Sequence, residues 1–390
     1  MVQLRRRDIL AGGAALAIAG TARAQAPKPK SPLAITVVDV AGNLALTQKA
    51  FESYRAAKPE MVSRFTFSKA PAPELPAKLR AQQSANRVDI DLVLTGTDAL
   101  AAGIDGKIWM PLYPDHAGSL PNLQSILLEP AWNMQSLAQN QAAVINYYPS
   151  GPLLEYMPDQ VASPPSTAAD LLAYTKSKPN RFMYARPANS GPGRTFLMGL
   201  PYILGDSDPK DPVKGWDKTW AYLKELDAGI EYYPTGTGAT MKELGEGSRD
   251  IIVSTTGWDI NPRALGIVPK EAKIATLAGF HWVVDAQYAA IPKGLDPERV
   301  AVLLDIISYL LMPAQQAFAY DDGYFYPGPA VKDVPLSMAP ESSRKVIGEF
   351  GRPEYDALIA SVPKEMPLDA DKMVMAFRRW DEQIGAKKSK

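Results

Sequence analysis

The 390-residue sequence contains no cysteine. This absence excludes disulfide bonds, thiolate metal sites, iron–sulfur clusters and cysteine nucleophiles together. Histidine is also scarce, since His116 and His281 are the two that occur, and two imidazoles cannot form a multi-histidine metal centre. We therefore expect neither a bound metal nor a cofactor. The 42 basic residues are balanced by 42 acidic ones, and this lack of excess positive charge argues against a nucleic-acid partner.

Apolar runs long enough to span a bilayer are missing as well. The uncharged apolar run at residues 9–20 has twelve residues, whereas a spanning helix needs about 20. Three arginines precede it, and Ala22-Arg23-Ala24 follows with the small-x-small pattern of a signal-peptidase site. We therefore predict that residues 1–24 are a signal peptide, cleaved between Ala24 and Gln25. The sequence RRDIL at residues 6–10 also resembles a twin-arginine export signal.

Export would change the charge of the chain. Residues 1–24 contain four arginines and one aspartate, so the mature protein has 38 basic and 41 acidic residues and a net charge of −3. Its composition, 46% hydrophobic and 22% charged over the whole chain, is typical of a globular protein, and its length suits two domains. The sequence predicts a periplasmic protein.

Strand and helix patterns alternate in the first part of the mature chain. They predict a β-α-β-α-β unit, with strands at 33–39, 64–68 and 89–94 and helices at 44–58 and 74–86. Residues 111–135 look irregular because they are rich in proline, asparagine and serine. A strand at 141–148 ends in Pro-Ser-Gly-Pro, and this break suits a crossing between domains.

The same alternation begins again after the break. Thr167 and Asp170 have the spacing of a capping box at the start of a helix. The patterns then predict strands at 181–185, 231–233, 250–254, 273–277 and 282–290, and helices at 194–204, 216–228, 239–244, 296–311 and 371–384. The similarity between the two halves lies in this order of elements, because no repeat of 20–50 residues is visible.

Several short motifs occur in a fixed order along this second half. They are PxTxxDLL at 165–172, GPGRTFL at 191–197, LGEG followed by DII at 244–252, Gly257-Trp258-Asp259, and AIPKG at 290–294. Together with the export signal, they resemble the extracellular solute-binding proteins (family 1) of ABC importers, a group that includes polyamine, thiamine and ferric-ion binders. The resemblance covers nearly the whole mature chain.

The resemblance implies an α/β fold of two lobes, the type II periplasmic-binding-protein fold. Each lobe would hold a mixed, mainly parallel sheet flanked by helices, with the ligand cleft between the lobes. Residues 25–148 would form the first part of lobe 1, residues 149–281 would form lobe 2, and residues 282–390 would return to lobe 1. It also implies that the protein acts as a monomer without enzymatic activity, captures a small polar solute and delivers it to an ABC-type membrane permease.

The loop at residues 189–195 is the most informative candidate for a ligand site. Its glycines, Gly191 and Gly193, allow the backbone to approach a ligand, and the helix that follows offers free N–H groups to an anion. Ser190, Thr195 and Arg194 add polar groups, and Arg194 suits a bidentate contact with phosphate, phosphonate or carboxylate. The alternative is an ordinary turn with Arg194 in solvent.

Other candidates lie at strand ends, where ligands bind in open α/β sheets. They are Asp39, Gly42, Asn43, Thr95, Gly96, Thr97 and Asp98 in lobe 1, Asn146 and Tyr147 at the first crossing, Thr256, Trp258 and Asp259 in lobe 2, Trp282 and Asp285 on the return strand, and Tyr324 in the C-terminal part. The alternatives are helix capping for Thr97 and Asp98 and core packing for the aromatic residues. Trp258 matches the position that stacks on the ligand in polyamine binders, and Asp259 suits an ammonium group.

The sequence departs from the subfamilies with known cations. Polyamine binders have an acidic residue five positions before the proline of the Ile-Pro motif, and this chain has Gln287 there. Ferric binders need adjacent tyrosines where this chain has Thr256-Gly257-Trp258. The loop at 189–195 indicates an anionic or zwitterionic solute, whereas Asp259 and Asp285 indicate an amine. We favour a solute with an anionic group, zwitterions included, over the alternative of an organic cation such as a polyamine or a thiamine-like amine.

Two further classes of function remain open. An exported enzyme is one, but Gly-x-Ser-x-Gly and His-Glu-x-x-His are absent, and the turn at 235–238 lacks the rest of a dinucleotide-binding motif. A sensor that presents a bound solute to a signalling partner is the other, and it would share the fold and the site with a transport protein.

Overall fold

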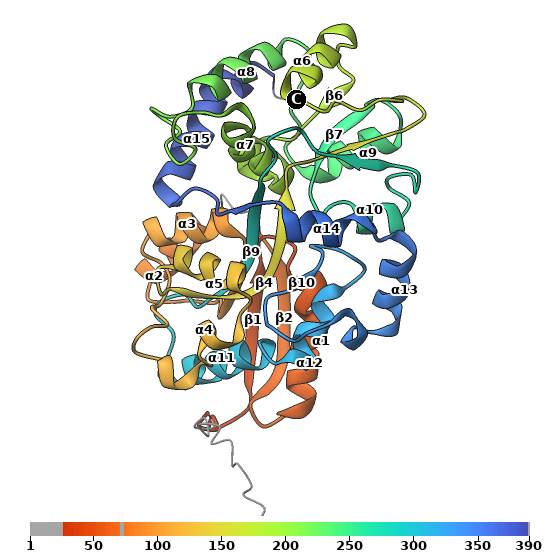
Figure 1. Cartoon of the computed structure of the whole chain (residues 1–390). Coiled ribbons are helices and arrows are strands. Elements are labelled where there is room, and N and C mark those ends of the chain that lie inside the picture. Colours follow the sequence, from red (N-terminus) through yellow and green to blue (C-terminus); the bar gives the residue numbers. More distant parts are fainter. Residues whose placement is uncertain (1–25, 71–73, 389–390) are drawn as a thin grey trace, which may run out of the picture.

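The computed structural model describes residues 26–70 and 74–388, and the predicted signal peptide lies outside them. These residues form two lobes, each built on its own sheet with helices around it, so the α/β class is confirmed (Figure 1). Two long strands, β4 (Ala142–Gly151) and β9 (Trp282–Ala290), run between the lobes.

Lobe 1 contains a seven-stranded mixed sheet in the order β10-β4-β9-β3-β1-β2, with β11 added to β9. The remaining strands are β1 (Leu33–Asp39), β2 (Val62–Lys69), β3 (Leu92–Thr95), β10 (Gly328–Pro329) and β11 (Lys364–Glu365). Strands β2, β1 and β3 are parallel, whereas β9 is antiparallel to both β3 and β4. The carboxyl ends of β1 and β3 therefore lie at one edge, which faces lobe 2.

Helices cover both faces of the lobe 1 sheet. They are α1 (Leu44–Ala57), α2 (Leu75–Ser84), α3 (Thr97–Asp105), α4 (Leu123–Ile126), α5 (Glu129–Gln135), α11 (Pro297–Leu310) and α12 (Pro313–Gln316). The β-branched side chains of β1, Ile35 and Val37, are fully buried between them, as the strand pattern predicted. The irregularity predicted for residues 111–135 is wrong in part, because α4 and α5 lie there, too short to show a helical period.

Lobe 2 contains a four-stranded sheet in the order β6-β7-β5-β8. Its strands are β5 (Leu153–Tyr156), β6 (Phe182–Met183), β7 (Ile251–Ser254) and β8 (Lys273–Ala275), and its helices are α6 (Ala168–Ser177), α7 (Gly191–Leu204), α8 (Asp217–Asp227), α9 (Thr237–Gly245) and α10 (Ile260–Ala264). The predicted capping box is present, since Thr167 and Asp170 exchange side-chain and backbone hydrogen bonds at the start of α6. The strand predicted at residues 231–233 does not form. Tyr233 is instead buried among the aromatic side chains of lobe 2.

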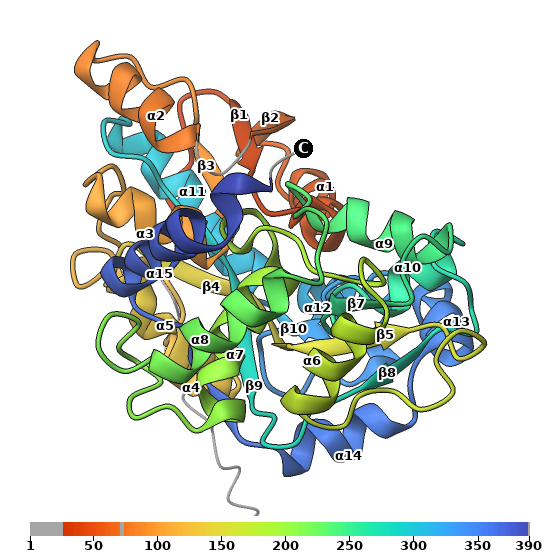
Figure 2. The ribbon, with the colours of Figure 1, turned by 90° about the horizontal axis from the view of Figure 1, so that it is seen from above.

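The C-terminal part differs from the expectation that residues 282–390 belong to lobe 1. Helices α13 (Glu341–Phe350) and α14 (Glu354–Ser361) lead to α15 (Ala370–Gln383), whose Met373, Ala376 and Trp380 lie in the apolar core of lobe 2. Helix α15 also contacts α3 of lobe 1, and Figure 2 shows the two helices beside each other. The reason is the aromatic cluster of lobe 2, where Trp380 donates a hydrogen bond to the Tyr184 hydroxyl.

None of the helices within residues 26–70 and 74–388 is by itself long and apolar enough to cross a membrane. The segments Pro297–Leu310 and Pro313–Tyr320 reach that composition as a pair, with a bend of 71° between them.

Candidate functional site

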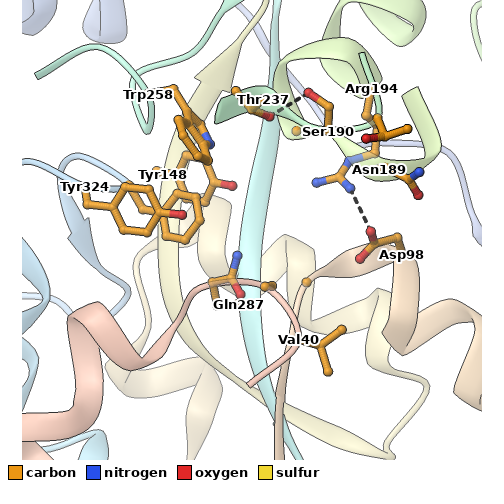
Figure 3. A pocket seen from close by; sticks show the side chains of 15 residues that line it. Val40, Asp98, Tyr148, Asn189, Ser190, Arg194, Thr237, Trp258, Gln287 and Tyr324 are labelled. Carbon is orange, nitrogen blue, oxygen red and sulfur yellow. Dashed lines mark hydrogen bonds and ion pairs between the residues drawn. The ribbon is translucent and has the colours of Figure 1, made fainter. Parts of the chain in front are cut away.

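A cavity of about 430 Å³ lies between the lobes, beside the crossing strands β4 and β9. Its lining comes from both lobes and from the crossings: Val40, Ala41, Gly96, Asp98, Tyr148, Asn189, Ser190, Gly191, Arg194, Thr235, Thr237, Trp258, Gln287, Tyr324 and Phe325. In Figure 3, three of its labelled aromatic residues lie on one side, Arg194 and Asp98 lie on the other, and Gln287 lies between them.

The starts of three helices line this cavity. Gly96 precedes α3, Ser190 precedes α7, and Thr237 is the first residue of α9. The first N–H groups of a helix have no partner within the helix, and they carry the positive end of its dipole. The side chains in the first turns of α7 and α9 include no acidic residue. The lobe 2 side of the cavity is therefore suited to an anionic group.

Arg194 lies in the first turn of α7 and is the positively charged residue of this lining. Its side chain is nearly buried, with 7% exposed, and its guanidinium pairs with Asp285 and with Asp98, the latter at 3.5 Å. Burial alone would lower the pKa of Arg194, but the negative charges of Asp285 and Asp98 raise it above its ordinary value. The guanidinium is thus held charged at the cavity wall.

Asp285 belongs to β9 and is held in place by hydrogen bonds from α3, β4 and its own strand. The Thr97 hydroxyl and the Tyr148 hydroxyl each donate a hydrogen bond to its carboxylate, both at 2.9 Å. Its own neighbour Ala286 adds a backbone N–H at the same distance. Because 1% of Asp285 is exposed, this carboxylate is a fixed part of the site that orients Arg194.

Uncharged polar groups complete this side of the cavity. The hydroxyls of Ser190 and Thr237 lie 2.7 Å apart and join the starts of α7 and α9. Gln287 on β9 is 2% exposed, and its buried carbonyl oxygen has no hydrogen-bond partner. Its amide nitrogen points into the cavity (Figure 3). A ligand therefore meets hydroxyl and amide groups beside the guanidinium.

Four aromatic residues form the opposite side, which we call the aromatic wall: Trp258, Tyr324, Phe325 and Tyr148. Trp258 meets Tyr324 edge to face at 5.5 Å, and Phe325 stacks on both Tyr324 and Tyr148. Flat π faces of this kind bind apolar groups and organic cations.

Seven of the residues predicted from the sequence line the cavity. They are Gly96, Asp98, Ser190, Gly191, Arg194, Trp258 and Tyr324. The interpretation of Arg194 as a solvated residue is wrong, because it is buried and paired with two carboxylates.

A second group of predicted residues lies behind the lining and supports it. Asp39 accepts hydrogen bonds from the backbone of Ala41, Asn43 and Leu44 at the start of α1. Thr97 holds Asp285, and Asn43 donates to the Asn146 side chain at 2.6 Å. The other members are Gly42 (φ +80°), Thr95, Tyr147, Gly193, Thr195 and Thr256.

Gly193 shows why these positions restrict the residue type. A Cβ atom at Gly193 would lie 2.2 Å from the Ala185 carbonyl oxygen, so the first turn of α7 packs directly on the backbone that follows β6. This close approach places Ser190 and Arg194 at the cavity.

The structure places two predicted residues elsewhere. Asp259 is fully buried and pairs with Arg263 at 3.0 Å and with Arg352 at 2.6 Å, so its carboxylate is not available to a ligand ammonium. Trp282 is fully buried in the apolar core and donates to the Leu358 carbonyl. Asp259 follows a turn and Trp282 begins a strand, and both positions look like cleft positions in the sequence. Each side chain is buried because it pairs with groups that are distant in the chain.

Sequence reasoning missed several lining residues. Thr237 was considered only as part of a dinucleotide-binding turn, and Gln287 only as a departure from polyamine binders. Tyr148 lies at the first crossing beside the predicted Asn146 and Tyr147 but was not chosen as a site residue. The signal available for Tyr148 is strand alternation: Tyr147 packs in the lobe 1 core, so its neighbour faces the opposite way. The remaining lining residues lie in or beside segments that the sequence analysis considered: Asn189 in the loop 189–195, Val40 and Ala41 between Asp39 and Gly42, Phe325 next to Tyr324, and Thr235 in the turn 235–238.

Residues 49–346 match the family model of bacterial extracellular solute-binding proteins. No curated protein matches the chain significantly.

Solved structures share the fold at low sequence identity. A periplasmic thiamin-binding protein is 14% identical, with a TM-score of 0.63 over 94% of this chain and 100% of that chain. The apo ferric ion-binding protein A of Pasteurella haemolytica is 13% identical, with a TM-score of 0.62 over 90% of this chain and 97% of that one. A spermidine/putrescine ABC transporter substrate-binding protein of Streptococcus pneumoniae is 12% identical, with a TM-score of 0.59 and coverages of 90% and 99%. These similarities confirm the two-lobed periplasmic-binding-protein fold.

Proposed function

Because this chain belongs to the bacterial extracellular solute-binding protein family, we propose that it captures a small polar solute in the periplasm and delivers it to the membrane permease of an ABC importer. The family consists of binding proteins, so the expectation that the chain is not an enzyme is confirmed. The fold similarity to an ABC transporter substrate-binding protein supports the role in import.

The solute that fits the cavity carries an anionic group. The observation behind this proposal is the buried guanidinium of Arg194, which lies at the cavity wall among the starts of α3, α7 and α9. The Nη1 group of Arg194, on the side away from the Asp285 contact, and the Ser190–Thr237 hydroxyl pair would bind a carboxylate, phosphate or phosphonate. The aromatic wall then receives an apolar or cationic body, which makes a zwitterion compatible with the site.

An organic cation is the second candidate. Asp98 and Asp285 outnumber Arg194 in charge, and the aromatic wall suits an ammonium group. The pairing of Asp285 with Arg194 neutralises both groups, so Asp98 is the carboxylate that this site offers to a ligand cation. The starts of α7 and α9, which carry no acidic residue in their first turns, are what favours the anionic candidate. A ferric ion is a different kind of cation and needs several ligands. Among the described residues, no group of three His, Asp or Glu side chains is placed to hold a metal ion.

Identification of the solute is the first experiment. We expect mass spectrometry of small molecules released from natively purified protein, together with a thermal-shift screen of anionic, zwitterionic and cationic solutes, to give hits with an anionic group.

Isothermal titration of each hit then tests the role of Arg194. Arg194→Gln keeps hydrogen-bond donors toward Asp285 and removes the charge, and we expect it to weaken binding at least tenfold. The matched control is Arg299→Gln, which removes a guanidinium paired with Asp91 at 3.0 Å in lobe 1, outside the cavity lining. Hits that are simple amines, with unchanged affinity in Arg194→Gln, would instead establish the cation candidate.

A further inference from the structure

Two carboxylates pair with Arg194, and the structure holds them very differently. Asp285 is 1% exposed and is fixed by hydrogen bonds from Thr97 and Tyr148. The side chain of Asp98 is 22% exposed, lines the cavity, and reaches Arg194 Nη1 at the longer distance of 3.5 Å. Asp285 is thus a permanent partner of the guanidinium, whereas Asp98 is an exchangeable one.

The Asp98–Arg194 contact also joins the two lobes. Asp98 lies in the first turn of α3 on lobe 1, and Arg194 lies in the first turn of α7 on lobe 2. In Figure 3 the dashed line between them crosses the cavity on the side away from the aromatic wall. A carboxylate in this position contacts the guanidinium from the direction in which the anionic group of a solute would approach.

We propose that Asp98 competes with the anionic group of the solute for Arg194. Without solute, its carboxylate pairs with Arg194 across the cleft; when the solute binds, its anionic group takes the place of Asp98. The inference rests on the proposed function, because it presupposes that Arg194 binds the solute. Asp98 then determines which anions bind. A simple anion leaves the displaced carboxylate of Asp98 without a positive partner, whereas a zwitterion can offer it a positive group.

The chemistry of Asp98 allows a clean substitution. Its Oδ1 atom accepts a hydrogen bond from the backbone of Ala99 at 2.8 Å, and an asparagine oxygen can accept the same bond. Asp98→Asn therefore removes the charge and retains the start of α3. The matched control is Asp105→Asn, which removes an exposed carboxylate at the other end of the same helix.

Inorganic phosphate is the probe, measured by isothermal titration up to 50 mM at an ionic strength held constant with sodium chloride. A partly exposed ion pair is worth up to about 1 kcal/mol, which corresponds to about fivefold in affinity, and loss of repulsion between Asp98 and the anion adds to it. We expect Asp98→Asn to bind phosphate about five- to tenfold more tightly than the wild-type protein. Asp105→Asn should change the Kd less than twofold, and Arg194→Gln should bind phosphate more weakly than either.

Each other outcome overturns the proposal in a recognisable way. Equal phosphate affinity of Asp98→Asn and the wild-type protein, with weakened binding by Arg194→Gln, would retain the anion site and reject Asp98 as a competitor. Weaker binding by Asp98→Asn, with an unchanged melting temperature, would make Asp98 a supporting residue. Absence of phosphate binding by every variant would reject the competitor, whereas the charge of the solute itself is decided by the solute screen under the proposed function.

A measurement without any probe tests the contact across the cleft. We expect the radius of gyration of Asp98→Asn from small-angle X-ray scattering to exceed that of the wild-type protein and of Asp105→Asn, because the cleft opens when the contact between the lobes is lost. Identical scattering curves for the three proteins would contradict the pairing in the absence of solute.

Discussion

Glu155 gives a sharp prediction for the pH dependence of folding. It lies in the middle of β5, fully buried, opposite Ile252 of β7 and Ile274 of β8. Burial and the negative charge of Asp259 raise the pKa of Glu155 to about 8, although the guanidinium of Arg352 opposes the shift. The folded protein therefore binds a proton on Glu155 at neutral pH, whereas the unfolded chain releases it near pH 4.5.

The direction of the effect follows from this difference. Since the unfolded chain loses its proton first, the stability associated with Glu155 is fully present below about pH 4.5 and is lost as the pH rises toward 8. A pKa difference of about 3.5 corresponds to at most about 5 kcal/mol. Glu155→Gln replaces the acid with a neutral group of the same shape, so it should be more stable than the wild-type protein by about 2 to 5 kcal/mol at pH 8.5.

The assay is denaturant unfolding at pH 5.0, 7.0 and 8.5, followed by circular dichroism. The advantage of Glu155→Gln should be small at pH 5.0 and grow at each higher pH. The control is Glu246→Gln, which removes a carboxylate with 60% of its side chain exposed in lobe 2 and should show no such growth. A stability difference between Glu155→Gln and the wild-type protein that stays constant across the three pH values would refute the reasoning.

Three further substitutions separate roles that look alike in the sequence. Trp258→Ala should weaken solute binding with a small effect on the melting temperature, because Trp258 lines the cavity. Trp282→Ala should destabilise folding by about 3 to 5 kcal/mol, because it leaves a cavity in the apolar core. Thermal denaturation and titration calorimetry of both variants check these predictions. Asp259→Asn should destabilise folding by about 3 kcal/mol, because the buried guanidinium groups of Arg263 and Arg352 lose their counter-ion, and an unchanged unfolding midpoint would exclude that role.

The sequence predicts most of the fold because its strands are buried and rich in β-branched residues. The strands at 33–39 and 282–290 begin and end where they were expected. What escapes prediction is decided by contacts distant in the chain. Strand β5 contains Glu155 and has no alternating pattern, and α15 shows an amphipathic period that does not reveal which lobe will receive Trp380.

The candidate site could be predicted at the level of loops and only partly at the level of residues. Strand ends carry the cavity because parallel strands and the helices after them bring these loops together. Whether a side chain faces the cavity depends on its partners: Asp259 meets Arg352, 93 residues away, and Asp285 meets Arg194, 91 residues away. Such pairings leave no local pattern in the sequence, so Gln287 and Thr237 were missed while Asp259 was included.

The distribution of the lining residues bears on how binding and lobe closure are coupled. Lobe 2 supplies Arg194, Ser190 and Thr237, while lobe 1 supplies Asp98, and Thr97 behind it holds Asp285. An anionic group that binds Arg194 from the cavity thus contacts one lobe strongly and must gain its remaining contacts from the other. A ligand shifts an equilibrium between open and closed lobes only by the difference between its affinities for the two states. The Asp98–Arg194 pair enters this difference with a negative sign, because a solute breaks this contact between the lobes only in the closed state. Binding therefore favours closure only when the contacts of the solute with both lobes exceed the contact that it replaces.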